Sequence, residues 1–175
     1  RSSTPSKPEI AVLEGIATLL QRAGLQPGDL MEVLHGTTVG SNTLLQKSGA
    51  RTGLITTRGF RDVLEIGRVR TPDMFDLQWD KPIPLVPRRW RRGVTERIAA
   101  DGAIIQPLDE AELHAIGAEL AAEGVESIAI CFINSFRNPV HEHRAEAVLR
   151  DNFPDLAITA SVSVLAEMRE YERTS

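Results

Sequence analysis

The chain has little cysteine, few aromatic residues and no strong charge of either sign. Its 175 residues include one cysteine, Cys131, and carry a formal net charge of −4. A single cysteine excludes an internal disulfide framework and a cysteine-only metal cluster, as is typical of proteins in a reducing cytosol. The slight acidity gives no basic field that would attract nucleic acid or an anionic membrane. We therefore expect a cytoplasmic protein with no nucleic-acid and no membrane partner.

Long apolar runs are also missing from the sequence. No stretch approaches the roughly 20 apolar residues that span a bilayer, and no basic-then-apolar leader opens the chain. Apolar residues still make up 42% of the composition, enough for a substantial core in one domain or in one domain with a small excursion. The polar residues 1–5 read like the middle of a longer protein, so we expect the chain to be part of one.

Helical and strand patterns alternate along the sequence. Apolar residues at helical spacing predict helices at residues 8–23, 39–47, 60–66, 109–122 and 141–153. Short apolar runs predict strands at residues 31–35, 52–57, 128–133 and 156–159. Asp101-Gly102, between the runs 93–99 and 103–106, predicts a hairpin. The alternation indicates an α/β layered fold with a mostly parallel sheet, right-handed crossovers and a hairpin insertion.

Two single features refine this prediction. Asp109 and Glu112 have the spacing of a capping box at the start of the helix 109–122. Cys131 lies inside the apolar run 128–133, so we expect a buried thiol that stays protonated and does not act as a nucleophile.

The most informative segment is a polar turn between a predicted strand and a predicted helix. Gly36 follows the apolar residues 31–34, and Thr37 and Thr38 can cap the helix that Gly49 ends. A helix N-terminus after a strand presents free N–H groups and a positive dipole end, so the turn is a candidate anion site. Asn42 lies one helical turn further, and its side chain could face the same crevice, in which the anion would lie. Simple capping of the helix remains the alternative interpretation.

A second candidate lies at the end of the next predicted strand. Thr56 and Thr57 close that strand, and ligands of open α/β sheets bind at the carboxyl ends of strands. Arg68 stands where a short helix runs into a long loop and could clamp a carboxylate or phosphate at two points. For Thr56 and Thr57 the alternative is an ordinary turn after the strand, with Gly59 in a left-handed conformation. For Arg68 the alternative is a surface arginine without a ligand.

Other features point to structure more than to chemistry. The proline-rich residues 68–92 contain both tryptophans and four clustered arginines, and we expect those arginines to form a solvated or interface patch. His141 and His143 lie on different faces of a helix, and the His-Glu-x-x-His spacing is absent, so we expect no metal site. His35 is expected to be a hydrogen-bonded core residue. No spacing identifies a nucleophile with its base, and the catalytic residues stay unknown.

The segments 35–51 and 54–68 together resemble the N-terminal region of the hydantoinase A / 5-oxoprolinase family, which includes N-methylhydantoinase-like and acetone carboxylase beta-like chains. The resemblance continues, in family order over nearly the whole chain, at residues 81–82, 84–88, 101–102, 107–110, 138–142 and 167–175. It implies an actin-like (sugar-kinase-like) ATPase fold, of which this chain would form part of the first lobe. Residues 1–175 would then be the family's N-terminal region without its upstream phosphate-binding hairpin, with an irregular arm and hairpin insertion at 68–106.

The resemblance also implies a function. It implies ATP and Mg²⁺ as cofactors and a cyclic amide such as a hydantoin or 5-oxoproline as substrate, opened after phosphorylation of the carbonyl oxygen. The substrate- or nucleotide-binding residues would be Gly36, Thr37, Thr38, Asn42, Thr56, Thr57 and Arg68. Expected partners are the remaining domains of the full-length chain, a hydantoinase B-like subunit and further copies in an oligomer. Two alternatives stay open: a ketone-activating, acetone-carboxylase-like subunit, and a non-catalytic region that docks a partner subunit.

Overall fold

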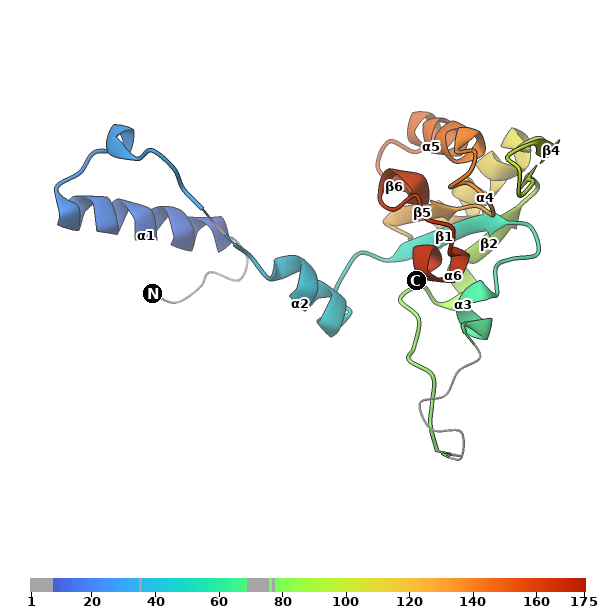
Figure 1. Cartoon of the computed structure of the whole chain (residues 1–175), viewed down its shortest axis with the longest axis horizontal. Coiled ribbons are helices and arrows are strands. Elements are labelled where there is room, and N and C mark those ends of the chain that lie inside the picture. The colour runs from blue at the N-terminus through green and yellow to red at the C-terminus, as the bar shows by residue number, and fades with distance from the viewer. Residues whose placement is uncertain (1–7, 35, 69–75, 77) are drawn as a thin grey trace. The chain divides into compact units, whose positions relative to one another are not determined.

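A computed structural model describes residues 8–34, 36–68, 76 and 78–175 (Figure 1). The chain separates into two compact units, which meet in sequence between Asn42 and Thr43. Within the described ranges, no helix is both long enough and apolar enough to cross a membrane.

The first unit contains the helix α1 (Pro8–Ala23) and a short 3₁₀ turn, η1 (Pro27–Asp29). Gly24 ends α1 in the left-handed region with a φ of 70°, as the sequence predicts. The predicted strand at 31–35 is wrong over its described part, because residues 31–34 form no strand and pair with no described neighbour. A strand needs a second strand to bond its N–H and C=O groups. The order strand 31–35, helix 39–47 and strand 52–57 also predicts a β-α-β unit, and the described residues contain no such unit because its first strand is missing.

The second unit is built on a parallel sheet, as expected. Its strands are β1 (Thr52–Thr57), β2 (Arg91–Val94), β5 (Ser127–Cys131) and β6 (Ala157–Ala160). They lie in the order β2-β1-β5-β6, and each neighbouring pair is parallel. The chain thus winds first to one side of β1 and then crosses to the other, which is the arrangement of a doubly wound α/β sheet.

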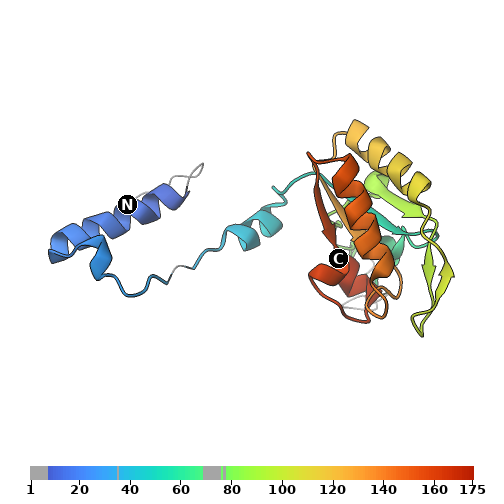
Figure 2. The ribbon, with the colours of Figure 1, turned by 90° about the horizontal axis from the view of Figure 1, so that it is seen from above.

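Helices cover both faces of this sheet (Figures 1 and 2). They are α4 (Glu110–Ala122) and α5 (Val140–Asn152) on one face and α3 (Val63–Ile66) and α6 (Glu170–Thr174) on the other. Adjacent residues of β1 show the division, since Ile55 belongs to the core under α4 and α5 whereas Leu54 packs with Leu64 of α3. Both faces of the central strand are buried, which explains why the adjacent residues Leu54 and Ile55 are both apolar.

The predicted hairpin is confirmed with a shorter first strand. β3 (Arg97–Ile98) pairs antiparallel with β4 (Ile104–Gln106), and Gly102 takes a φ of 94° in the turn. The first residues of the run 93–99 belong instead to β2 of the main sheet, because they pair with β1.

The predicted capping box of α4 is only half correct. Asp109 caps the helix by accepting the N–H of Glu112 at 2.9 Å. The Glu112 carboxylate, however, accepts the N–H of Thr95 at 2.8 Å and pairs with Arg58. Glu112 therefore joins α4 to the segment after β2 and does not close the box. The remaining regular elements of the described residues are α2 (Val39–Gln46) and the 3₁₀ turns η2 (Arg88–Trp90) and η3 (Ser161–Ser163).

Candidate functional site

The turn before α2 (Val39–Gln46) carries the hydroxyl groups that the sequence predicts. Thr37 Oγ1 accepts the N–H of Val39 at 3.3 Å, and Thr38 Oγ1 accepts an amide N–H of Asn42 at 3.2 Å. Thr38 and Asn42 thus lie on the same side of the first helical turn. For the N–H groups of Gly40 and Ser41, the described residues provide no hydrogen-bond acceptor. The turn, which Gly36 precedes, has the groups that an anion at a helix N-terminus would use.

Thr57, at the carboxyl end of β1, belongs to a buried polar chain. Its hydroxyl donates to Glu96 Oε1 and accepts the N–H of Ile133 at 3.0 Å. The other oxygen of Glu96 lies 2.8 Å from Nδ1 of His141 in α5. All three polar side chains are buried. These hydrogen bonds therefore connect the ends of β1 and β5 to the segment after β2 and to α5.

The two threonines of β1 do not present hydroxyl groups to a ligand in this structure. Thr56 is buried, and its hydroxyl donates to the carbonyl oxygen of Thr57 at 3.2 Å. The hydroxyl of Thr57 is fully engaged by Glu96 and Ile133. Both residues shape the end of the strand. Glu96 could not be found from the sequence, since nothing in the residues around it indicates that a carboxylate so close to a hairpin is buried.

Arg68 is held by a partner from the end of the chain. Its Nε donates to Glu172 Oε1 at 2.7 Å, and Nη2 contacts the same oxygen. This hydrogen bonding lowers the pKa of Glu172 below its ordinary value. Arg68 therefore joins the segment after α3 to α6.

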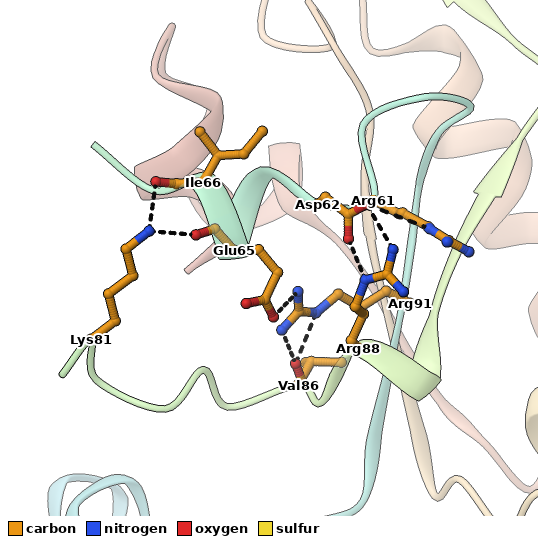
Figure 3. A network of polar contacts seen from close by, with 8 residues as sticks. All are labelled: Arg61, Asp62, Glu65, Ile66, Lys81, Val86, Arg88 and Arg91. Atoms are coloured by element: carbon orange, nitrogen blue, oxygen red, sulfur yellow. Dashed lines mark hydrogen bonds and ion pairs between the residues drawn. The ribbon is translucent and has the colours of Figure 1, made fainter. Parts of the chain in front are cut away.

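The arm before β2 is fastened to α3 by cations (Figure 3). Lys81 Nζ donates to the carbonyl oxygens of Glu65 and Ile66, at 2.7 and 3.2 Å. These two oxygens lie at the end of α3, where carbonyl groups have no N–H partner within the helix. Arg88 forms a two-point contact with Asp62 at 2.7 and 3.0 Å, and this contact lowers the pKa of Asp62. The described part of the arm is thus tied to the body of its own unit.

The expectation of a solvated arginine patch is wrong for Arg91, which is 1% exposed. Its Nε and Nη2 both donate to the carbonyl oxygen of Val86, at 2.9 and 2.8 Å. Its Nη1 donates to Glu65 at 2.9 Å. The planar guanidinium lets one side chain hold the arm and α3 together inside the protein.

Further findings concern single residues that the sequence singles out. Cys131 is buried as predicted, and burial raises the pKa of its thiol. Trp90 packs against both core clusters. The described residues contain no group of three or more His, Cys, Asp or Glu side chains that could hold a metal ion. His35 lies outside the described residues.

The fold and the turns at its strand ends define an open α/β domain of the kind that binds small ligands at the carboxyl edge of its sheet. Residues 1–153 match the model of the hydantoinase/oxoprolinase N-terminal region. The chain therefore belongs to the hydantoinase/oxoprolinase family, as the sequence motifs predict.

Two of the similar proteins come from an archaeon and a bacterium. The chain is 38% identical over 99% of its length to an uncharacterised protein of Methanocaldococcus jannaschii, of which it covers 25%. It is 37% identical to the caprolactamase subunit alpha of Pseudomonas jessenii, over 99% of this chain and 26% of that one. The chain thus spans about a quarter of the length of these relatives.

Two solved structures resemble the chain. The crystal structure of the ATP-dependent caprolactamase from Pseudomonas jessenii matches with a TM-score of 0.84 and 36% identity, over 98% of this chain and 26% of that chain. The nucleotide-free structure of acetone carboxylase matches with a TM-score of 0.87 and 25% identity, over 99% of this chain and 27% of that chain. Both similarities support the α/β fold with a mostly parallel sheet.

Proposed function

We propose that the chain is part of an ATP-dependent enzyme that opens a cyclic amide or imide. The observation that carries this proposal is the 37% identity with a caprolactamase subunit over 99% of the chain. An amide is a poor electrophile, and ATP would supply a phosphoryl group that turns the carbonyl oxygen into a good leaving group. Transfer of that group depends mainly on positioning and on charge neutralisation. The actin-like lobe expected for residues 1–175 remains part of this proposal.

The turn before α2 is the part of the chain that fits a phosphate or a polarised carbonyl oxygen. N–H groups at a helix N-terminus and the hydroxyls of Thr37 and Thr38 favour a negative charge there. The hydrogen bond from Asn42 to Thr38 fixes the orientation of the Thr38 hydroxyl. We propose that this turn, with Gly36 at its start, contacts the ligand.

Thr56, Thr57 and Arg68 enter the proposal as positioning residues. The threonines hold the end of β1 through buried hydrogen bonds, and Arg68 holds α6. Mg²⁺ enters the proposal together with ATP, as the ion that would neutralise charge on the phosphates.

Activation of a ketone for carboxylation is the second candidate. It is favoured by the similarity to acetone carboxylase, with a TM-score of 0.87. Phosphorylating a carbonyl oxygen serves both reactions, so the residues of this chain do not separate them. The full-length protein and a hydantoinase B-like partner subunit belong to either version of the proposal.

The test is ATP hydrolysis by the full-length protein with caprolactam, hydantoin, 5-oxoproline or acetone. Stimulation by a cyclic amide supports ring opening, whereas stimulation by acetone alone supports the carboxylase alternative. Thr38→Ala should abolish the stimulation, and Thr18→Ala, a change of the same kind on α1, should preserve it. Equal activity of Thr38→Ala and wild type would contradict the assigned role of the turn. The 175 residues alone are expected to give no turnover.

The docking alternative needs its own experiment. Deleting the whole arm would remove Arg91 from the core, so loss of association in that variant would have no clear meaning. Ile83 and Leu85 are better targets, because they are 76% and 51% exposed on the arm. If Ile83→Ser with Leu85→Ser abolishes subunit association but preserves ATP binding, the arm is a docking element. Intact association would rule these two side chains out of the interface.

A further inference from the structure

An open pocket of about 420 Å³ lies in the second unit beside the turn that follows β1. Charged residues dominate its lining, which includes Arg58, Arg61, Asp62, Arg92 and Glu112. Three guanidinium groups thus face two carboxylates. The volume is within the range of small-molecule sites, which is roughly 300–1,000 Å³.

The topology explains why a pocket forms at this place. Residues 58–62 follow the carboxyl end of β1. The chain winds from β1 to β2 on one side and continues to β5 and β6 on the other, so the direction of winding reverses at β1. Open α/β sheets bind ligands outside such strand ends. The turn after β1 lies close to Gly93 of β2. A side chain at this position would crowd the turn, because its Cβ would lie 3.0 Å from Cα of Arg58. Gly59, with a φ of 91°, provides the left-handed residue of the turn.

The two carboxylates of the pocket are already engaged. Asp62 uses both oxygens to accept the two-point contact from Arg88. Glu112 pairs with Arg58 and accepts the N–H of Thr95 at 2.8 Å. Neither carboxylate is therefore available to neutralise a further cation.

Arg61 is the arginine of this pocket with the weakest partner. Its contact among the described residues is Nε to Asp62 Oδ2 at 3.7 Å, beyond hydrogen-bond distance, and its side chain is 50% exposed. By contrast, Arg92 pairs with Glu119 and Glu123. Arg61 therefore offers its guanidinium donors to a ligand.

We propose that this pocket binds a small phosphate-type oxyanion, with Arg61 as a two-point donor and Arg58 and Arg92 as flanking charges. A planar guanidinium matches the geometry of phosphate oxygens in charge-assisted hydrogen bonds. The ligand is either inorganic phosphate or the phosphate group of a nucleotide. The pocket shares no residue with the turn before α2, so the proposal does not rest on the proposed function.

The experiment is isothermal titration calorimetry of the full-length protein with inorganic phosphate and with AMP. The variants are Arg61→Gln and the matched control Arg144→Gln, which removes the same charge from a side chain that is 56% exposed. We expect Arg61→Gln to weaken binding of at least one probe about tenfold or more, which corresponds to about 1.4 kcal/mol, and Arg144→Gln to change it less than about twofold. A single cooperative thermal unfolding transition in each variant would show that all variants are folded.

Each outcome decides the proposal. Arg61-dependent binding of phosphate identifies the free anion as the ligand, and Arg61-dependent binding of AMP alone identifies a nucleotide. Equal losses in Arg61→Gln and Arg144→Gln would reveal only a general charge effect and overturn the site. Absence of binding by wild type up to about 20 mM, or binding that Arg61→Gln leaves intact, would overturn it too.

Discussion

Glu96 and His141 form a buried polar pair in which Oε2 of the glutamate lies 2.8 Å from Nδ1 of the histidine. The two residues are 45 positions apart in sequence, and the pair joins the segment after β2 to the start of α5. Thr57 extends it to the end of β1. Three segments that meet at the carboxyl edge of the sheet are thus held by one set of hydrogen bonds, which fixes the geometry of the turns beside it.

The first prediction concerns this pair. Glu96→Ala should lower the free energy of unfolding by about 3 kcal/mol, because it leaves the buried groups of His141 and Thr57 without their partner. Glu119→Ala is the control, since Glu119 is 61% exposed and its loss should cost less than about 1 kcal/mol. Urea unfolding measures both values. Similar losses in the two variants would contradict a special role for the buried carboxylate.

The buried arginine leads to the second prediction. Arg91→Ala should destabilise the protein by about 3 kcal/mol, because it leaves the Val86 carbonyl oxygen without its donors and empties a filled core position. Arg91→Lys should recover only part of the loss, since an ammonium lacks the planar fork. The exposed neighbour Arg89 is the control, and Arg89→Ala should change the urea midpoint little. Full rescue by lysine would show that charge alone matters.

Much of the fold could be predicted because its signals are local. The apolar run 128–133 supplies most of β5, which ends at Cys131, and the spacing around Asp109 identifies a helix start, whatever the rest of the chain does. The hairpin at Asp101-Gly102 is equally local, because the turn itself selects the backbone conformation. These elements agree with the structure to within a few residues.

The errors concern contacts between distant segments. Residues 31–34 have the composition of a strand, but a strand exists only when a second strand pairs with it. Arg91 reads as a surface charge until the Val86 carbonyl oxygen and Glu65 are placed around it. Glu112 has the spacing of a capping box, yet Thr95 takes its carboxylate. No local pattern carries this information.

The same limit applies to the candidate site. The threonines before α2 and the hydrogen bond between Thr38 and Asn42 could be expected from helix geometry. The hydrogen bond between Thr57 and Glu96 could not be expected from the sequence, because the two residues are 39 positions apart. Thr56 and Thr57 lie at a strand end, as the sequence predicts, but the hydrogen bonds of their hydroxyls could not be predicted from it.

A third prediction compares two glycines in helices. A Cβ on Gly117 would lie 2.6 Å from Cε2 of Phe153 and 2.8 Å from Cδ2 of Leu149, so Gly117→Ala should force α4 away from α5 and cost about 1–3 kcal/mol. Gly15 of α1 has nothing within 4 Å of the added atom. Gly15→Ala should therefore stabilise its helix by up to about 1 kcal/mol. Opposite shifts of the urea midpoint are expected, and a stabilising Gly117→Ala would contradict the close packing.

The contact between Arg88 and Asp62 predicts how the arm responds to acid. Hydrogen bonding to Arg88 holds the pKa of Asp62 below its ordinary value of 3.8. Because the folded pKa is the lower one, the unfolded chain binds more protons in acid. The stabilisation is therefore fully present above the ordinary pKa and is lost as the pH falls through the lowered value. It should be constant near neutral pH.

Thermal unfolding of wild type and Arg88→Gln at a series of pH values tests this sign. The Tm of the variant should be lower than that of wild type by a constant amount at about pH 5–7, and the difference should shrink below about pH 4. Arg144→Gln is the matched control, because it removes an equally exposed arginine whose partner, Glu110, also has a lowered pKa but lies away from the arm. Both differences should therefore shrink in acid, whereas limited proteolysis of the arm at neutral pH should accelerate only in Arg88→Gln. A Tm difference that grows in acid would contradict the pairing, because it would mean that Arg88 stabilises the protonated form of Asp62.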